Sequence, residues 1–427
     1  MPQAIPQLTQ FRVEARDNGL IHLVFDCPGK SMNVFSNTAI HELGTFAEWL
    51  HRSDVRGVVV RSGKDTGFCA GADLTELGVA YEMIIAAPPA DRFDMAFDHF
   101  FPLSHAIRRL ETSGKPVAAA IHGVALGGGC ELTLGCHYRV ATNSRRTVLG
   151  LPECAVGLLP GAGGTQRMPR LVGIDLGLEI LLLGRNLQGQ AARDAGLVDE
   201  LAEEGAEVAA AEAWLLSGDA HSIQPWDRAD AVPLDHAACS APLTAHRARE
   251  LARMLGHEPA PLAILDCVEL GLMQPIDGAI RSEMSVFSAL IQRPEPRNMI
   301  RTMFLGKQAW DKAERAGKIP PEVEAAAAAI LQCSAAAVAS CPQLRCAGFS
   351  ADGKQAEPVQ QRAGRDYWFL SQPRIKARIA ALAQETSRLI EPLSDVARLQ
   401  LDHACVRNGA LPAYLGGATG IVELASS

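Results

Sequence analysis

The chain has 427 residues and a formal net charge of −8, with 48% hydrophobic and 21% charged residues. This composition fits a globular protein of two or three domains, and since no Lys/Arg-rich block is present we expect no nucleic-acid partner. We find no run of about 18 apolar residues that would predict a membrane span, the N-terminus has no secretory-signal pattern, and the eleven cysteines are scattered, so we expect a cytoplasmic protein with reduced thiols.

Strand and helix patterns alternate along the first 170 residues. Short β-branched or small apolar runs bounded by turn residues predict strands at 20–25, 57–61, 117–121 and 138–142. Apolar residues at three- and four-residue spacing predict helices at 39–52 and 101–113. This alternation is typical of an α/β domain.

Strand signals fade after about residue 170, and helical patterns take over. Loop-like composition marks 216–242, and the "GKIPPE" segment around 317–321 must end a helix. An alanine-rich helix follows, then a loop-like stretch at 347–373 and helical spacing again at 374–406. We therefore divide the chain into an α/β core at 8–215, a helical extension at 216–316 and a helical tail at 317–427.

Several common site motifs are absent from the sequence. The "GKS" at 29–31 lacks the upstream glycine of a phosphate loop, because that position is Val24. No GxGxxG fingerprint, GxSxG elbow or HExxH zinc motif is present. Cys333, Cys341 and Cys346 lie closest to one another, but with no CxxC pair or nearby histidine they do not predict a metal site.

Two glycine-rich segments each follow a predicted strand. They are "GFCAGADL" at 67–74 and "ALGGGCEL" at 125–132. Small residues at such places let backbone N–H groups approach a ligand, and two N–H groups aimed at one point can form an oxyanion hole. Read singly, a glycine run is more often just a tight turn, so the alternative for each segment is purely structural.

Two glutamates stand among apolar residues near these segments. Glu131 follows the three glycines directly, and Glu153 lies in a third segment, "GLPECAVGLLPGAGGTQR" at 150–167. Burial raises the pKa of a carboxyl group and two neighbouring carboxyls titrate apart, so one can act as an acid and the other as a base. The alternative is that each glutamate is solvated at a helix surface or ion-paired.

Taken together, in this order and spacing, these segments resemble the crotonase (enoyl-CoA hydratase/isomerase) superfamily. The resemblance is closest to the hydratase half of the multifunctional fatty-acid oxidation enzymes, because it continues through "LLLGRNLQGQAARDAGLVDE" (181–200) and a linker-like helix at 287–312. It implies an α/β fold with a crotonase-like ββα spiral core and a helical C-terminal extension. Those enzymes continue into a NAD-binding domain, whose glycine fingerprint is missing here, so we interpret 317–427 as a remnant of a dehydrogenase C-terminal domain.

The resemblance implies a role for particular residues. By position in the motifs, the backbone N–H groups of Ala72 and Gly128 would form the oxyanion hole for a thioester carbonyl. Glu131 would activate a water for attack at Cβ and Glu153 would protonate Cα, although sequence leaves open which glutamate is acid and which is base. The resemblance further suggests Lys30, Ala70, Asp73 and Leu74 near the coenzyme A, and Pro160 and Gly161 in the acyl pocket. Arg167 is expected to anchor the turn before it rather than to contact substrate.

The reaction implied is hydration of a 2-enoyl-CoA to a 3-hydroxyacyl-CoA in a β-oxidation-type pathway. No cofactor is implied beyond the coenzyme A of the substrate, and no metal. The first alternative is an enoyl-CoA isomerase or other crotonase chemistry, such as a thioester hydrolase or lyase. The second is a weakly active subunit that docks a separate dehydrogenase or thiolase, and a homo-oligomer is also possible.

Overall fold

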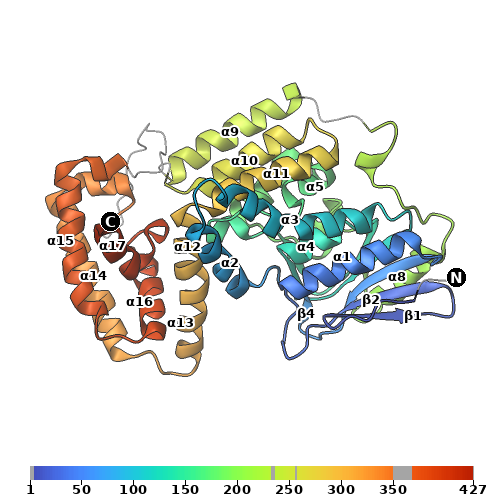
Figure 1. Ribbon diagram of the computed structural model, residues 1–427, viewed down its shortest axis with the longest axis horizontal. Coiled ribbons are helices and arrows are strands. Elements are labelled where there is room, and N and C mark those ends of the chain that lie inside the picture. The colour runs from blue at the N-terminus through green and yellow to red at the C-terminus, as the bar shows by residue number, and fades with distance from the viewer. Residues whose placement is uncertain (1–3, 232–235, 255–256, 350–367, 427) are drawn as a thin grey trace. The chain divides into compact units, whose positions relative to one another are not determined.

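The structure is a computed structural model that describes residues 4–231, 236–254, 257–349 and 368–426 (Figure 1). The chain divides into two compact units. The sheet unit comprises the chain up to Cys154, Leu159–Leu243 and Ala263–Ala289, and the helical unit comprises Ala155–Leu158, Thr244–Leu262 and the chain from Leu290 onward. The three-part division expected from the sequence stays a prediction.

The sheet unit contains two β-sheets. The larger has the strand order β1-β2-β3-β5-β7-β9, with β1 and β2 antiparallel and every other pair parallel. The smaller is parallel, in the order β4-β6-β8. The strands are β1 (Phe11–Ala15), β2 (Leu20–Phe25), β3 (Gly57–Ser62), β4 (Gly67–Cys69), β5 (Val117–Ile121), β6 (Val124–Leu126), β7 (Tyr138–Thr142), β8 (Val148–Gly150) and β9 (Glu200–Ala202).

The chain adds one strand to each sheet on every pass. β3 is followed by β4, β5 by β6 and β7 by β8, and helices lie between these pairs. This repeat is the ββα spiral that the sequence predicts, so the expected fold class is confirmed. The four predicted strands are all present as β2, β3, β5 and β7, and the central ones are buried along their length because helices pack on the sheet.

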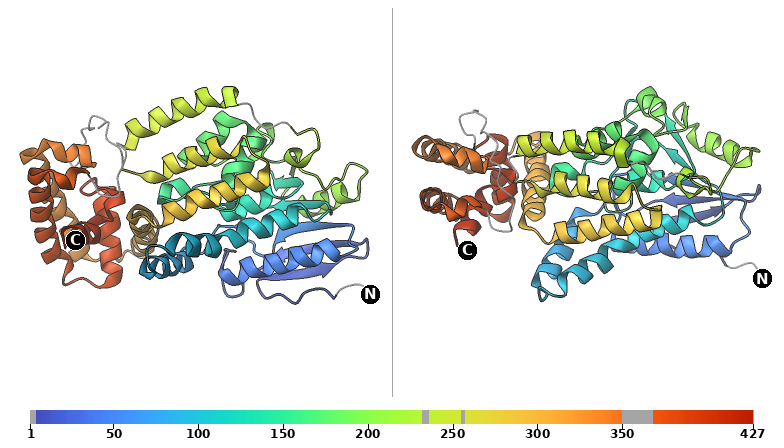
Figure 2. Two further views of the ribbon diagram at one scale, coloured as in Figure 1. Left: turned by 45° about the horizontal axis from the view of Figure 1, so that its top comes forward. Right: turned by 90° about the horizontal axis from the view of Figure 1, so that it is seen from above.

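Helices cover the larger sheet and flank the glycine-rich segments. α1 (Asn37–Arg52) and α3 (Arg92–Glu111) pack side by side (Figure 2), and α8 (Glu207–Leu216) packs on the sheet through Ala211 and Leu215. α1 begins where the Ser36 side chain accepts a hydrogen bond from the N–H of Ala39, as N-cap residues do. The other helices within this unit are α2 (Leu74–Ala86), α4 (Gly128–Leu134), α5 (Gly164–Val172), α6 (Ile174–Leu183) and α7 (Gly189–Asp194).

Three expectations about element boundaries need correction. α3 begins at Arg92 rather than near 101 and carries Pro102 inside it. β9 lies beyond the point where strand signals fade, because three half-buried residues are too short to give a pattern. The predicted loop 216–242 holds the 3₁₀ turn Pro225–Asp227 and, from His236, the start of α9 (His236–Met254).

α10 (Pro259–Gly271) and α11 (Ile276–Ile291) follow α9. The helical unit then has an apolar core that includes Val323, Ile330, Leu401 and Ile421. Its later helices are α12 (Pro294–Met299), a π-helix (Ile300–Leu305), α13 (Gly306–Arg315), α14 (Pro321–Ser340), α15 (Pro373–Ile390), α16 (Asp395–Arg407) and α17 (Gly417–Ser426). The predicted break between 315 and 321 is present, whereas most of the predicted loop 347–373 lies outside the described residues.

Among the described helices, α14 is long and apolar enough to cross a membrane by length and composition, with a mean hydropathy of 1.5 over its best window. The sequence pattern did not predict a membrane span here, because alanines supply much of the hydropathy of α14. It packs against α15 and α16, and core helices of globular proteins pass the same test.

Candidate active site

Two of the three glycines at the start of α4, Gly127 and Gly129, are required by close packing. Gly127 has φ 54° and ψ −131°, a conformation that side chains disfavour, and a Cβ there would lie 2.9 Å from Oε1 of Glu153. A Cβ on Gly129 would lie 2.5 Å from the carbonyl oxygen of Cys69, at the end of β4. The two glycine-rich segments therefore pack directly against each other, with one glutamate beside them.

The backbone N–H groups of Ala72 and Gly128 are free donors. Phe35 donates its N–H to the carbonyl of Gly71 and accepts from the N–H of Asp73, which turns the N–H of Ala72 away from this bridge. Gly128 is the first residue of α4, so its N–H has no partner within the helix. Neither group donates a hydrogen bond to any described residue. A Cβ on Gly71 would lie 3.5 Å from the nitrogen of Gly128, so the two segments meet here.

Glu131 is buried in the first turn of α4, with 2% of its surface exposed. Its Oε1 accepts hydrogen bonds from the N–H groups of Ala162 (2.7 Å) and Gly164 (2.8 Å). Burial raises the pKa of its carboxyl to about 7, although the two N–H groups oppose the shift. The carboxyl is therefore poised to exchange a proton near neutral pH.

Glu153 follows Pro152 at the start of a 3₁₀ turn, Glu153–Val156. The residue as a whole is half-buried, but its Oε2 is shut off from solvent and has no hydrogen-bond partner among the described residues. Burial, and next the charge of Glu131, raise the pKa of Glu153 well above its usual value. The structure thus brings together the two glutamates singled out from the sequence.

A third buried carboxyl, Glu283 on α11, was missed from the sequence. Its Oε1 accepts the N–H of Gly163 at 2.6 Å, and its Oε2 accepts the N–H of Thr165 at 3.0 Å and the Thr165 hydroxyl. Burial and the charge of Glu131 raise the pKa of Glu283 to about 8. A signal was present, since Glu283 lies on the apolar face of its helix between Ile280 and Phe287, where an acidic residue is unusual.

The residues predicted near coenzyme A lie at the start of α2. Lys30 forms an ion pair with Asp73, and Asp73 also caps α2 by accepting the N–H of Thr75 at 3.0 Å. Ala70 is exposed, and Leu74 is the half-buried first residue of the helix. The four residues are thus neighbours, but Lys30 and Asp73 are occupied with each other. Their contact with coenzyme A stays a prediction.

The residues predicted to line the acyl pocket lie close to α11. Pro160 is buried, and a Cβ on Gly161 would lie 3.2 Å from the ring of Phe287. Phe287 also meets the ring of Phe100 edge-on, with centroids 5.0 Å apart. These aromatic rings therefore border the turn that carries Gly161.

Arg167 anchors this turn, as the sequence suggested. Its fully buried guanidinium donates to the carbonyl of Ala162 at 3.1 Å and makes a two-pronged ion pair with Glu111. Arg108 also contacts Glu111, at 3.0 Å. The hydrogen bond from Arg167, together with the buried ion pairs of Glu111, therefore holds the turn at the start of α5 in place.

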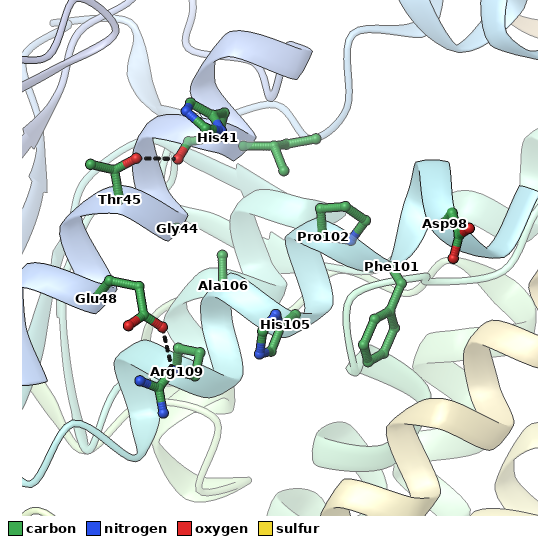
Figure 3. Close-up of a pocket in the computed structure, with 11 residues that line it drawn as sticks. His41, Gly44, Thr45, Glu48, Asp98, Phe101, Pro102, His105, Ala106 and Arg109 are labelled. Carbon is green, nitrogen blue, oxygen red and sulfur yellow. Dashed lines mark hydrogen bonds and ion pairs between the residues drawn. The ribbon is translucent and has the colours of Figure 1, made fainter. Parts of the chain in front are cut away.

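A pocket of about 390 Å³ lies elsewhere, between α1 and α3 (Figure 3). It contains neither Glu131 nor Glu153, and Glu48 and Arg109 form an ion pair of 2.8 Å at one end. Its labelled residues are His41, Gly44, Thr45, Glu48, Asp98, Phe101, Pro102, His105, Ala106 and Arg109. We assign the candidate active site to the buried carboxyls rather than to this surface groove.

The ββα spiral with its paired buried carboxyls has the fold expected of a crotonase-type domain. A family model described as enoyl-CoA hydratase/isomerase matches residues 15–217, so this part of the chain is a domain of that family. Among curated proteins, the fatty acid oxidation complex subunit alpha of Idiomarina loihiensis is 33% identical over 315 residues, and that of Shewanella loihica is 34% identical over 315 residues. Each alignment covers 73% of this chain, and the chain spans 43% of the length of either relative.

Solved structures of similar proteins include two of this family. An enoyl-CoA hydratase from Bacillus halodurans has a TM-score of 0.49 and 19% identity, covering 68% of this chain and 99% of that one. A putative enoyl-CoA hydratase/isomerase family protein from Hyphomonas neptunium has a TM-score of 0.42 and 29% identity, covering 48% of this chain and 74% of that one.

Proposed function

We propose that this protein hydrates 2-enoyl-CoA thioesters to 3-hydroxyacyl-CoA. The observation that carries the proposal is the pair of buried carboxyls, Glu131 and Glu153, each with a raised pKa, beside the free N–H groups of Ala72 and Gly128. Two donors at one point suit the oxygen of a thioester carbonyl, whose negative charge grows as a nucleophile adds at Cβ. Two carboxyls that titrate apart suit simultaneous acid and base catalysis.

In the proposed reaction, Glu131 accepts a proton from water as the water oxygen bonds to Cβ. The electrons of the double bond move toward the thioester and form an enolate, which the N–H groups of Ala72 and Gly128 stabilise. Glu153 then delivers its proton to Cα. One water is consumed, and the proton gained by Glu131 must pass to Glu153 before the next cycle. The assignment of base to Glu131 fits its two N–H donors, which favour the carboxylate.

An isomerase that moves a double bond between the β,γ and α,β positions is the second candidate. It is favoured by one observation, namely that Oε2 of Glu153 has no partner among the described residues. A single carboxyl of this kind can take a proton from one carbon and return it to another. A screen of 2-enoyl-CoA and 3-enoyl-CoA substrates, with product identification, separates the two activities. Conversion of 3-enoyl-CoA alone, with no 3-hydroxyacyl-CoA formed, would refute the hydratase proposal.

The setting of the reaction is also a proposal. The names of the curated relatives place those proteins in a fatty acid oxidation complex, and we propose a β-oxidation-type pathway and a cytoplasmic location for this chain. Residues 317–427 are proposed as a remnant of a dehydrogenase C-terminal domain that docks a separate dehydrogenase or thiolase. Tightly bound NAD, or oxidation of hydroxyacyl-CoA by the pure protein, would contradict the remnant interpretation.

A further inference from the structure

The turn 162–165, which leads into α5 and includes its first two residues, offers its backbone N–H groups alternately to two carboxylates. The N–H groups of Ala162 and Gly164 donate to Glu131, and those of Gly163 and Thr165 donate to Glu283. Four consecutive N–H groups are thereby used, two on each side. The turn cannot shift relative to one carboxylate without changing its hydrogen bonds to the other.

We propose that Glu283 is a positioning residue, which fixes the turn 162–165 from the side opposite Glu131 and so sets where the Glu131 carboxylate lies. The role of the placed carboxylate as a base rests on the proposed function. Glu283 itself does not contact the reacting atoms. It acts through the backbone, because the hydrogen bonds that the Glu131 carboxylate accepts from described residues come from the two N–H groups that Glu283 leaves to it.

Among the described residues, Glu283 and Glu131 are the carboxyl groups that accept the N–H groups of residues 162–165. No ion pair among the described residues includes Glu131, Glu153 or Glu283. Glu131 and Glu283 are therefore held in place by hydrogen bonds, with the charge of Arg167 acting on both without direct contact. Arg167 contacts the turn through the Ala162 carbonyl, but its guanidinium is committed to Glu111. A buried carboxylate with three donors is a costly arrangement to keep unless it serves the fold or the site.

When it is ionised, Glu283 also acts on the carboxyl of Glu153. It raises the pKa of Glu153, after burial and the charge of Glu131. Removing it should let Glu153 lose its proton at lower pH, and the basic limb of the pH profile should move the same way. The titratable groups that face Glu283 from neighbouring elements are Glu131 on α4, Glu153, Arg167 and Arg170 on α5, and Cys267 on α10.

The test compares Glu283→Gln with Glu42→Gln in the full chain. Glu42 is a matched control because its carboxylate likewise accepts a threonine hydroxyl and backbone N–H groups, those of residues 9–11, but it lies on α1 away from the site. With crotonyl-CoA we expect E283Q to lose about 10- to 100-fold in kcat with little change in KM, and its basic limb to move to lower pH. We expect E42Q to keep the wild-type kcat and profile while its unfolding midpoint falls.

A purely structural role for Glu283 would lower the unfolding midpoint of E283Q as in E42Q, with kcat per folded molecule and both limbs unchanged. That outcome overturns the proposal. If E283Q does not fold, Thr165→Val removes the hydroxyl donor to Glu283, together with the hydrogen bond that this hydroxyl accepts from Gln166, and keeps the backbone N–H. A severalfold loss of kcat at constant KM supports the proposal, and an unchanged kcat overturns it.

A second measurement tests the role of Glu283 even if the protein turns out not to be a hydratase. If the wild-type protein hydrates no enoyl-CoA, the link between Glu283 and Glu131 is measured by unfolding of E131Q, E283Q and the double variant. Effects of the two changes on the unfolding midpoint that do not add support the shared turn. Additive effects overturn the inference whether or not the protein is a hydratase.

Discussion

The raised pKa of Glu131 predicts how the unfolding free energy of the protein depends on pH. Its ordinary value is 4.5 and burial raises it to about 7, so the folded state holds this proton more tightly than the unfolded chain. The stabilisation is fully present below pH 4.5 and is lost as the pH rises through 7. At 1.36 kcal/mol per pKa unit, the loss amounts to about 3 kcal/mol of unfolding free energy.

Glu131→Gln removes this ionisable group and also the charge that raises the pKa of Glu153 and Glu283, and both changes make the variant less sensitive to rising pH than the wild type. Both N–H groups donate to the same oxygen, Oε1, so the glutamine carbonyl can accept both while the ionisable group disappears. Urea unfolding of wild type and E131Q, followed by far-UV circular dichroism from pH 5 to 8.5, gives the difference in unfolding free energy at each pH. The helical unit is the same in both proteins, so its contribution to the unfolding free energy cancels when the value for one protein is subtracted from that for the other.

We expect the unfolding free energy of E131Q, relative to that of the wild type, to rise by about 3 kcal/mol between pH 5 and pH 8.5. Glu42→Gln is the control of opposite sign: burial opposes ionisation of Glu42, but hydrogen bonds from Thr9, Gln10 and Phe11 outweigh it and lower its pKa. Its stabilisation is present above pH 4.5 and lost as the pH falls, so the E42Q difference should be flat over the same range. An E131Q difference that does not grow with pH would refute the burial argument.

Further predictions concern the backbone and the buried charges around the site. Gly127→Ala introduces a Cβ 2.9 Å from Oε1 of Glu153 at a φ of 54°, so we expect a loss of about 1–3 kcal/mol in stability and a lower kcat, measured by thermal unfolding and steady-state kinetics; a variant as stable and active as wild type contradicts the close packing. Arg167→Met removes one of two cations beside the buried Glu111 and leaves Arg108 in place. We therefore expect a loss of about 1.5–3 kcal/mol in urea unfolding at pH 7, and Glu111→Gln combined with it should recover part of that loss. No recovery in the double variant would mean that the arginine acts mainly through the Ala162 carbonyl.

The sequence predicted much of this site because its chemistry lies in short contiguous segments. The glycines at 127–129 and the two glutamates could each be recognised from the residues next to them in the sequence. Glycine offers only its backbone N–H and carbonyl groups, and glutamate offers a carboxyl group, so the residue types alone restrict their possible roles. What the sequence did not reveal is how tightly the segments pack, for example that Gly129 has no room for a Cβ against Cys69.

The pairing of Glu283 with the turn 162–165 could not be predicted from the sequence. Glu283 lies 120 residues beyond Gly163 in the chain, on a helix predicted only as part of an extension. Its partners are backbone N–H groups, which any residue possesses, so no side-chain pattern marks the pairing. β9 and the start of α9 were missed for a related reason, since burial there depends on tertiary packing rather than on local periodicity.

We propose that Glu131 and Glu153 act together to hydrate an enoyl thioester. The most direct measurement is kcat and KM for crotonyl-CoA, followed by loss of the enoyl-thioester absorbance, for wild type, E131Q and E153Q, with E42Q as control. We expect each active-site variant to lose about 10²- to 10⁴-fold in kcat at nearly constant KM, while E42Q stays close to wild type. Near-normal turnover by both E131Q and E153Q would contradict the account.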